Sequence, residues 1–351
     1  MNKSNLYLIA AISVSLFLNS CSNQPEQQKE ASTENEESKI DAEINPRLTA
    51  FAALPVVAEN PDNPATDAKV KLGHALYFDT RLSKEGTISC NSCHNLETFG
   101  VDNLPTSPGD AGKNGERNSP TVLNASLHTT QFWDSRAKDV EEQAGMPILN
   151  PVEMMIPDEA FLVERLSAVP EYKLLFNEAF PGKGITYQNL QLAIAAFERK
   201  LITPSRFDKY IAGDNTALTL EEKKGLNNFI KIGCTTCHNG STLGGNMMQK
   251  FGVHREYWTL TESKKIDDGK AALTKVESDK YIFKVPSLRN IEKTYPYFHD
   301  GSVPDLKKAI QIMAVAQLAY RMSPEELNSV EAFLKSLTGD IAAEYKKAPA
   351  L

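Results

Sequence analysis

Cys90-Asn91-Ser92-Cys93-His94 and Cys234-Thr235-Thr236-Cys237-His238 are the most informative stretches of this 351-residue chain. Both have the pattern C-x-x-C-H, which is typical of covalent c-type haem attachment. The two thiols bond to the haem vinyl groups, and the histidine binds the iron from the proximal side. The repeat predicts two covalently bound haem c groups, attached at Cys90, Cys93, Cys234 and Cys237, with His94 and His238 as iron ligands.

Other uses of paired cysteines explain the pattern less well. A zinc ribbon places two C-x-x-C units about 15–20 residues apart, whereas 144 residues separate Cys90 from Cys234. A thioredoxin-like redox site needs one such unit and no histidine after it. Two disulfides would suit an exported protein, but they leave the repeated histidine unexplained.

The fifth cysteine follows an export signal. Lys3 precedes an apolar run over residues 6–18, which is too short to be read as a spanning helix. Because Leu18-Asn19-Ser20-Cys21 resembles the end of a bacterial lipoprotein signal, we expect residues 1–20 to be removed and Cys21 to carry the lipid. Ordinary signal cleavage with a spare thiol is the alternative. The predicted location is the periplasmic side of a membrane, with the outer membrane favoured.

Residues 21–45 contain seven acidic residues, two lysines and no aromatic residue. Such a composition cannot bury a core, so this segment is predicted to be a flexible acidic tether. The rest of the mature chain is nearly neutral, and no basic stripe indicates nucleic acid as a partner. It is long enough for two domains. The motifs suggest an N-terminal haem domain at residues 46–204 and a C-terminal haem domain at residues 205–351.

Helix signals are frequent and strand signals are absent. Thr186 is expected to begin a helix, Thr219 begins a capping box, and Ser323 stands before a proline at the first helical position. Long stretches rich in Gly, Pro and Asn occupy residues 95–120 and 235–300. We expect a mainly α fold of two cytochrome c-like domains, each built around one covalently attached haem, with long loops.

Further motifs over residues 66–340 resemble those of bacterial dihaem cytochrome c peroxidases and follow the same order. They are Leu72-Gly73, Leu76-Tyr77-Phe78-Asp79, Arg81-Leu82-Ser83, Arg117-Asn118-Ser119-Pro120-Thr121, Gln131-Phe132-Trp133-Asp134, Pro296-Tyr297-Phe298-His299 and Phe333-Leu334-Lys335-Ser336-Leu337-Thr338-Gly339. The resemblance implies reduction of hydrogen peroxide to water with electrons from a small cytochrome c or a copper protein. It implies that the C-terminal haem receives the electrons and that the N-terminal haem breaks the O–O bond.

The resemblance also implies a second iron ligand for the C-terminal haem. Met313 matches the methionine of the resembling enzymes, and a thioether ligand raises the reduction potential of a haem. Leu306 and Ile310 share its helical face, so a core methionine is the alternative. Family relatives that oxidise the side chains of a partner protein tend to have tyrosine at this position.

The expected catalytic pair is Glu153 and Gln143. Glu153 matches a glutamate that acts as general acid and base in O–O cleavage. Its neighbours Val152 and Met154 suggest partial desolvation, which raises the pKa of a carboxyl; a solvated surface glutamate is the alternative. Gln143 matches the glutamine that orients peroxide, although the two carboxylates before it suggest an exposed helix face.

Three further roles follow from the resemblance. Trp133 matches a residue placed between the haems, so we expect it to serve electron transfer as well as packing. A calcium ion is expected at Asn118, Thr294 and Pro296, which would supply hard oxygen ligands. His299 is interpreted as a structural residue or a neighbour of the site.

Asp110 is a departure from the family pattern. Many members have a histidine there, which binds the peroxidatic iron in the oxidised enzyme and must leave before peroxide binds. A carboxylate is a poor substitute for imidazole. We therefore expect the first haem to be five-coordinate or water-bound when fully oxidised, without a need for reductive activation. His74 and His128, the nearest substitutes, are interpreted as structural or surface histidines.

Two other functions stay open at this stage. The chain could be a lipid-anchored dihaem electron-transfer cytochrome without peroxidase activity, or a haem oxidase acting on a partner protein. The sequence does not reveal the oligomeric state; a homodimer is possible, because the resembling enzymes are commonly dimeric.

Overall fold

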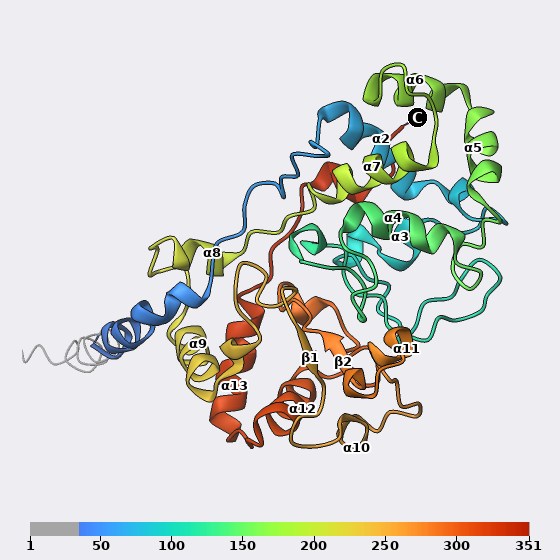
Figure 1. Cartoon of the computed structure of the whole chain (residues 1–351). Helices are drawn as coiled ribbons and strands as arrows, with labels where there is room; N and C mark the ends of the chain where they lie inside the picture. The colour runs from blue at the N-terminus through green and yellow to red at the C-terminus, as the bar shows by residue number, and fades with distance from the viewer. Residues whose placement is uncertain (1–34, 351) are drawn as a thin grey trace, which may run out of the picture. The chain divides into compact units, whose positions relative to one another are not determined.

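Helices dominate the structure, as the sequence predicts. The computed structural model describes residues 35–350, so the predicted signal sequence and Cys21 lie outside the described residues. Among the described residues, no helix is long and apolar enough to cross a membrane. Figure 1 shows the arrangement of the elements. The α-helices are α2 (Asp67–Phe78), α3 (Cys90–Cys93), α4 (Val140–Leu149), α5 (Glu159–Ser167), α6 (Pro170–Ala179), α7 (Tyr187–Glu198), α8 (Arg206–Ile211), α9 (Leu220–Ile232), α10 (Tyr257–Thr261), α11 (Ala271–Thr274), α12 (Leu306–Leu318) and α13 (Pro324–Lys335).

Short 3-10 turns and two strands complete the elements found in residues 45–350. The turns are η1 (Asn45–Ala50), η2 (Thr80–Leu82), η3 (Leu96–Thr98), η4 (Ala125–Leu127), η5 (Cys234–Thr236), η6 (Glu277–Asp279), η7 (Ile291–Lys293) and η8 (Ala343–Lys346). The strands β1 (Met248–Lys250) and β2 (Ile282–Lys284) pair antiparallel, with Met248 opposite Lys284. The sequence did not predict this ribbon, because three residues are too few to show an alternating pattern.

Two close helix pairs form the frame that carries the haem motifs. Helix α2 packs on α7, and a Cβ atom at Gly73 would lie 1.9 Å from the carbonyl oxygen of Ala193. Helix α9 packs on α13, and a Cβ atom at Gly225 would lie 1.8 Å from the carbonyl oxygen of Ser329. Only glycine allows backbones to approach so closely. In both cases the helix that precedes a C-x-x-C-H motif is fixed against a later helix.

The predicted helix starts are confirmed. The side chains of Thr186, Thr219 and Ser323 accept hydrogen bonds from backbone N–H groups in the first turns of α7, α9 and α13. Helix α9 ends at Gly233, which has a φ of 100° in the left-handed region. Cys234 follows at once, so the stop signal of this helix leads the chain directly into the second motif.

Buried apolar residues form separate clusters in the two halves of the chain. The largest includes Phe333 and lies mainly among residues 207–337, and a second, which includes Phe176, lies among residues 72–194. The ends of the chain cross between the halves. Phe51 joins the first cluster, and Ile341 joins a third cluster in the N-terminal half.

The expected tether is shorter than predicted at its carboxyl end. Residues 40–44 are helical and pack on the body. Asp41 forms a 3.0 Å ion pair with Lys223 and accepts a 2.8 Å hydrogen bond from the Tyr210 hydroxyl. Ile44 is fully buried in the largest cluster. Composition alone missed this segment because Ile40, Ile44, Asp41 and Glu43 find specific partners on the body.

Candidate active site

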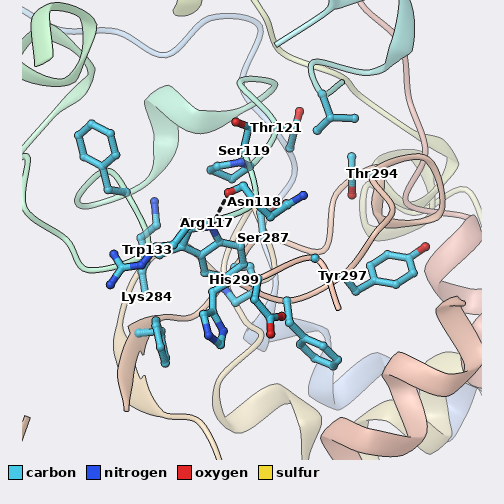
Figure 2. Close-up of a pocket in the computed structure, with 18 of the residues that line it drawn as sticks. Arg117, Asn118, Ser119, Thr121, Trp133, Lys284, Ser287, Thr294, Tyr297 and His299 are labelled. Carbon is cyan, nitrogen blue, oxygen red and sulfur yellow. Dashed lines mark hydrogen bonds between the residues drawn. The ribbon is translucent and has the colours of Figure 1, made fainter. Parts of the chain in front are cut away.

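One cavity of about 1370 Å³ brings the candidate residues together. Its wall contains residues from both halves of the chain, and Figure 2 shows part of it. The candidate residues on this wall are Cys90, Cys93, His94, Asn118, Trp133, Gln143, Glu153, Cys234, Cys237, His238, Thr294, Pro296 and Met313.

Both C-x-x-C-H motifs fold as a single helical turn. The backbone N–H of His94 donates to the carbonyl of Cys90 at 2.9 Å, and that of His238 donates to the carbonyl of Cys234 at 3.0 Å. The same hydrogen bond therefore places each histidine one turn after the first cysteine of its motif. In each motif, two thiols and an imidazole then line the same part of the cavity wall. This arrangement suits haem c, in which the thiols bond to the edge of the porphyrin and the imidazole binds the iron from one face.

The chemical state of these groups fits covalent haem. The four cysteines are free of disulfides, and burial raises the pKa of Cys90 to about 12 and that of Cys93 to about 11. Nδ1 of His238 lies 3.0 Å from the carbonyl oxygen of Leu243, which leaves Nε2 for a ligand in the cavity. Burial lowers the pKa of both His94 and His238, which favours the neutral, metal-binding imidazole.

The methionines differ in their relation to the cavity. Met313 lies on α12, and its face with Leu306 and Ile310 forms part of the cavity wall. Met322 also lines the cavity and is buried. The sulfur of Met248 instead accepts a hydrogen bond from the Ser135 hydroxyl at 2.6 Å. Met154 lines the cavity too, but in the N-terminal half. Of the two lining methionines that follow the second motif, only Met313 has the family match.

Glu153 lies in a partly desolvated position. Burial raises the pKa of its carboxyl, against the opposing effects of Arg136 and of a hydrogen bond from Asn150. The Asn150 side chain donates to Oε1 of Glu153 at 2.9 Å. Gln143, on α4, reaches the same cavity. The upward pKa shift is the one expected from the apolar neighbours of Glu153.

Trp133 lies where the two halves of the chain meet. Its indole Nε1 donates to the carbonyl of Asn118 at 2.9 Å, as the dashed line in Figure 2 marks. The backbone N–H of Asn118 donates in turn to the carbonyl of His299 at 2.7 Å. The His299 ring stacks on Phe283 with centroids 4.3 Å apart. Arg117 pairs with Asp267 at 2.7 Å across the same junction.

The expected calcium ligands come from both halves. Asn118, Thr294 and Pro296 all line the cavity. The side-chain amide of Asn118 donates to the carbonyl of Leu104 at 2.9 Å, which fixes its orientation. In residues 35–350 no group of three or more His, Cys, Asp or Glu residues could hold a metal ion. A cation here would therefore depend on amide, hydroxyl and carbonyl oxygens.

Asp110 is not among the residues that line the cavity, and its carboxylate is bound elsewhere. Its carboxylate accepts hydrogen bonds from the Ser83 hydroxyl at 2.9 Å, the Glu85 backbone at 2.6 Å and the Thr87 hydroxyl at 2.5 Å. Burial alone would raise the pKa of Asp110, but these hydrogen bonds hold it below its usual value. His74 stacks on the Phe197 ring at 4.7 Å, consistent with a structural role.

The sequence analysis did not single out Glu198 or Lys284, and it interpreted His128 only as a structural or surface histidine. Glu198 ends α7, is 5% exposed and lines the cavity. Lys284 and His128 also line it and lie 3.3 Å apart. The available signals were weak, because none of the three residues belongs to a recognisable motif.

Several known proteins resemble this chain. Residues 67–216 match the family model described as di-haem cytochrome c peroxidase. The cytochrome c551 peroxidases of Nitrosomonas europaea and Pseudomonas aeruginosa are each 46% identical to it, over 82% and 84% of this chain and 84% and 86% of their own lengths. A crystal structure described as a MauG-like protein associated with microbial copper homeostasis is 28% identical, with a TM-score of 0.75, over 84% of this chain and 97% of that one. The mainly helical fold is thereby confirmed. The chain belongs to the di-haem cytochrome c peroxidase family, which implies two haem c groups.

Proposed function

We propose that this protein reduces hydrogen peroxide to water with electrons from a small redox protein. The observation that carries the proposal is the position of Glu153, a carboxylate of raised pKa on the wall of the cavity that holds both C-x-x-C-H motifs. The two cytochrome c551 peroxidases, at 46% identity over most of both chains, support it. Each peroxide molecule takes two electrons and two protons and leaves as two water molecules.

The two haems have different tasks in this proposal. The N-terminal domain, residues 46–204, holds the peroxidatic haem through Cys90, Cys93 and His94. The C-terminal domain, residues 205–351, would hold the electron-receiving haem through Cys234, Cys237, His238 and Met313. When bound, the haem irons supply electron storage and, in the N-terminal domain, an open position for peroxide. The separate apolar clusters of the two halves support this division.

Glu153 performs the proton transfer. In its ionised form it takes a proton from one peroxide oxygen and returns it to the other, so that O–O cleavage releases water. Asn150 holds Oε1 of Glu153 at 2.9 Å and thereby fixes the carboxyl plane. Gln143 is assigned to orient peroxide on the same wall.

Trp133 is assigned to electron transfer between the haems. Its hydrogen bond to Asn118, and the bond from Asn118 to His299, hold the indole between segments from both halves. This position supports the role because an aromatic ring at the junction shortens the path between the motifs.

A calcium ion is assigned to Asn118, Thr294 and Pro296. The absence of a carboxylate-rich cluster within residues 35–350 makes this a weakly charged site, so a chelator should remove the ion readily. Because the three residues come from both halves, removal of calcium is expected to slow electron transfer between the haems. Re-addition of calcium should restore the rate.

Asp110 supports a peroxidatic iron that is open in the oxidised protein. Its carboxylate is saturated by Ser83, Glu85 and Thr87. We infer that the first haem is five-coordinate or water-bound and that no reductive activation is needed.

The proposed donor is a small cytochrome c or a copper protein in the periplasm. Export and a lipid on Cys21 are inferred from the first residues of the sequence, which lie outside the described structure. A homodimer is part of the same proposal.

Steady-state peroxide consumption with a reduced small cytochrome tests the function. We expect turnover by the wild type and its loss in Glu153→Gln. A protein that exchanges electrons with the cytochrome but consumes no peroxide would be an electron carrier, and the proposal would fail.

A further inference from the structure

Lys284 is a buried cation on the cavity wall. Its side chain is 7% exposed and lies at the end of β2, beside Trp133 in Figure 2. Its backbone N–H donates to the carbonyl of Trp133 at 2.7 Å. Its ammonium donates to the carbonyl of Thr130 at 2.9 Å and lies 3.3 Å from Nδ1 of His128.

His128 is held as a neutral acceptor for this ammonium. An ammonium has only donors, so Nδ1 of His128 must accept and the imidazole proton must be on Nε2. Nε2 is buried. The ring lies against Gly245, where a Cβ atom would come within 2.2 Å of it, so glycine leaves the space that this ring fills. Burial and the charge of Lys284 together hold the pKa of His128 well below its usual value.

The two protein contacts leave one N–H of Lys284 and its charge unmatched. Of the carboxylates in residues 35–350, none forms an ion pair with Lys284, and Asp134 acts on it only at longer range. Asp134 is itself paired with Arg117 at 2.7 Å and Arg136 at 3.0 Å. A buried ammonium without a counter-ion costs several kcal/mol. The cavity beside it must therefore supply an anion, or the amine must lose its proton.

We propose that Lys284, held by Thr130 and His128, binds a carboxylate of the haem attached at Cys234 and Cys237. Haem carries propionate side chains that require such partners when they are buried. The position favours the second haem because Gly245 follows the His238 motif and donates to the carbonyl of Val285, next to Lys284, at 2.7 Å. The inference rests on the haem attachment described above, but it does not depend on peroxide turnover. Lys284 is thus a haem-binding and positioning residue.

Redox titration of the holoprotein tests this assignment. In Lys284→Met the lost positive charge should lower the midpoint potential of the His238 haem more than that of the His94 haem. Lys284→Arg keeps the charge and should retain most of the wild-type value. Lys250→Met is the matched control, because Lys250 lies on the partner strand β1 but is exposed. Absorption spectra should show both haems attached in every variant.

Two results would overturn the assignment. Equal potentials in wild type, Lys284→Met and Lys250→Met would show that Lys284 does not face a haem carboxylate. A wild-type potential that changes with added acetate would show that a free anion, rather than the haem, is the partner. Absence of peroxide turnover in the wild type, with these shifts still present, would contradict the proposed function but leave this inference standing.

Discussion

The backbone N–H of Asp110 donates a 2.8 Å hydrogen bond to the backbone carbonyl of Glu153. The loop that carries Asp110 therefore lies directly on the segment that carries the proposed catalytic carboxylate. Gly109 allows this approach, because a Cβ atom there would lie 1.8 Å from the carbonyl oxygen of Val152. Movement of this loop would break that hydrogen bond and four more at the Asp110 carboxylate.

The fully oxidised protein is expected to react with peroxide without prior reduction of the second haem. The Asp110 carboxylate is bound to Ser83, Glu85 and Thr87, so nothing in this loop position offers imidazole to the iron. Electron paramagnetic resonance should show a high-spin ferric signal for the His94 haem, and stopped-flow traces should show no activation lag. A low-spin signal with two histidine ligands at that haem contradicts the expectation.

Asp110→Ala tests the loop itself. The substitution leaves the Thr87 hydroxyl and the Glu85 backbone N–H without their acceptor, so we expect a loss of about 1–3 kcal/mol in the free energy of unfolding. Without these hydrogen bonds the loop should become more mobile, and Glu153, to which it is bonded, should become less well ordered. We therefore also expect slower peroxide turnover. Unfolding in denaturant measures the first effect and steady-state assay the second. Unchanged stability would show that these hydrogen bonds contribute nothing.

Glu153→Gln should lower peroxide turnover by about 10²–10⁴-fold, the usual contribution of a general acid and base. The raised pKa of Glu153 gives the wild type a definite pH profile. Activity requires the ionised carboxylate, so it should fall with decreasing pH at values above the usual range of a glutamate. Glu164→Gln, at an exposed position of α5, is the control. Equal activity in both variants would remove Glu153 from the mechanism.

Trp133→Phe separates electron transfer from chemistry. The variant keeps an aromatic ring but loses the indole hydrogen bond to Asn118, at a cost of about 1 kcal/mol. We expect slower turnover in steady state, because electrons must cross between the haems, and an unchanged first reaction of peroxide with the His94 haem. Rapid mixing followed at both haems distinguishes the two steps. A slowed first reaction would instead place Trp133 in peroxide binding.

Local rules made much of this fold predictable. The caps at Thr186, Thr219 and Ser323 depend on hydrogen bonds within one helical turn, so the sequence reveals them directly. The C-x-x-C-H turns are local in the same sense. The convergence of Cys90 and Cys234 on one cavity could not be read from spacing, because it depends on how the halves pack.

The missed groups depend on distant contacts. Lys284 and His128 are 156 residues apart in the sequence, and neither lies in a motif that predicts their contact. Glu198 stands between Phe197 and Arg199 at the end of α7, where a helical pattern would leave a glutamate exposed. Its burial follows from the packing around the cavity, and Arg199 pairs with Glu141 instead, at 2.7 Å. Such groups become visible only when the tertiary structure is known.

Met313→His should lower the reduction potential of the His238 haem, because replacing a thioether with imidazole stabilises the ferric form. Met322→Leu is the matched control, since Met322 also lines the cavity but lacks the family match. Redox titration followed by absorption measures both variants. A lower potential in Met322→Leu, with no change in Met313→His, would transfer the ligand role to Met322.

Glu198 predicts a pH dependence of stability. Burial and the nearby charge of Glu141 raise its pKa to about 8, against the opposing effect of Arg199. In the unfolded chain its pKa is the usual value of 4.5. The folded state therefore keeps the proton where the unfolded state has lost it. This contribution is fully present below pH 4.5 and is lost as the pH rises towards 8, by at most about 1.4 kcal/mol per pH unit.

Glu198→Gln removes this titration while keeping the shape of the side chain. We expect the variant and the wild type to have similar free energies of unfolding near pH 5, and the variant to be the more stable at pH 8. Denaturant unfolding at several pH values measures the difference, with Glu164→Gln as the exposed control on α5. Parallel pH profiles of wild type and Glu198→Gln would mean that Glu198 is ionised in the folded protein. It would then need a buried positive partner, and the carboxylate could not serve as a neutral part of the cavity wall beside Cys90.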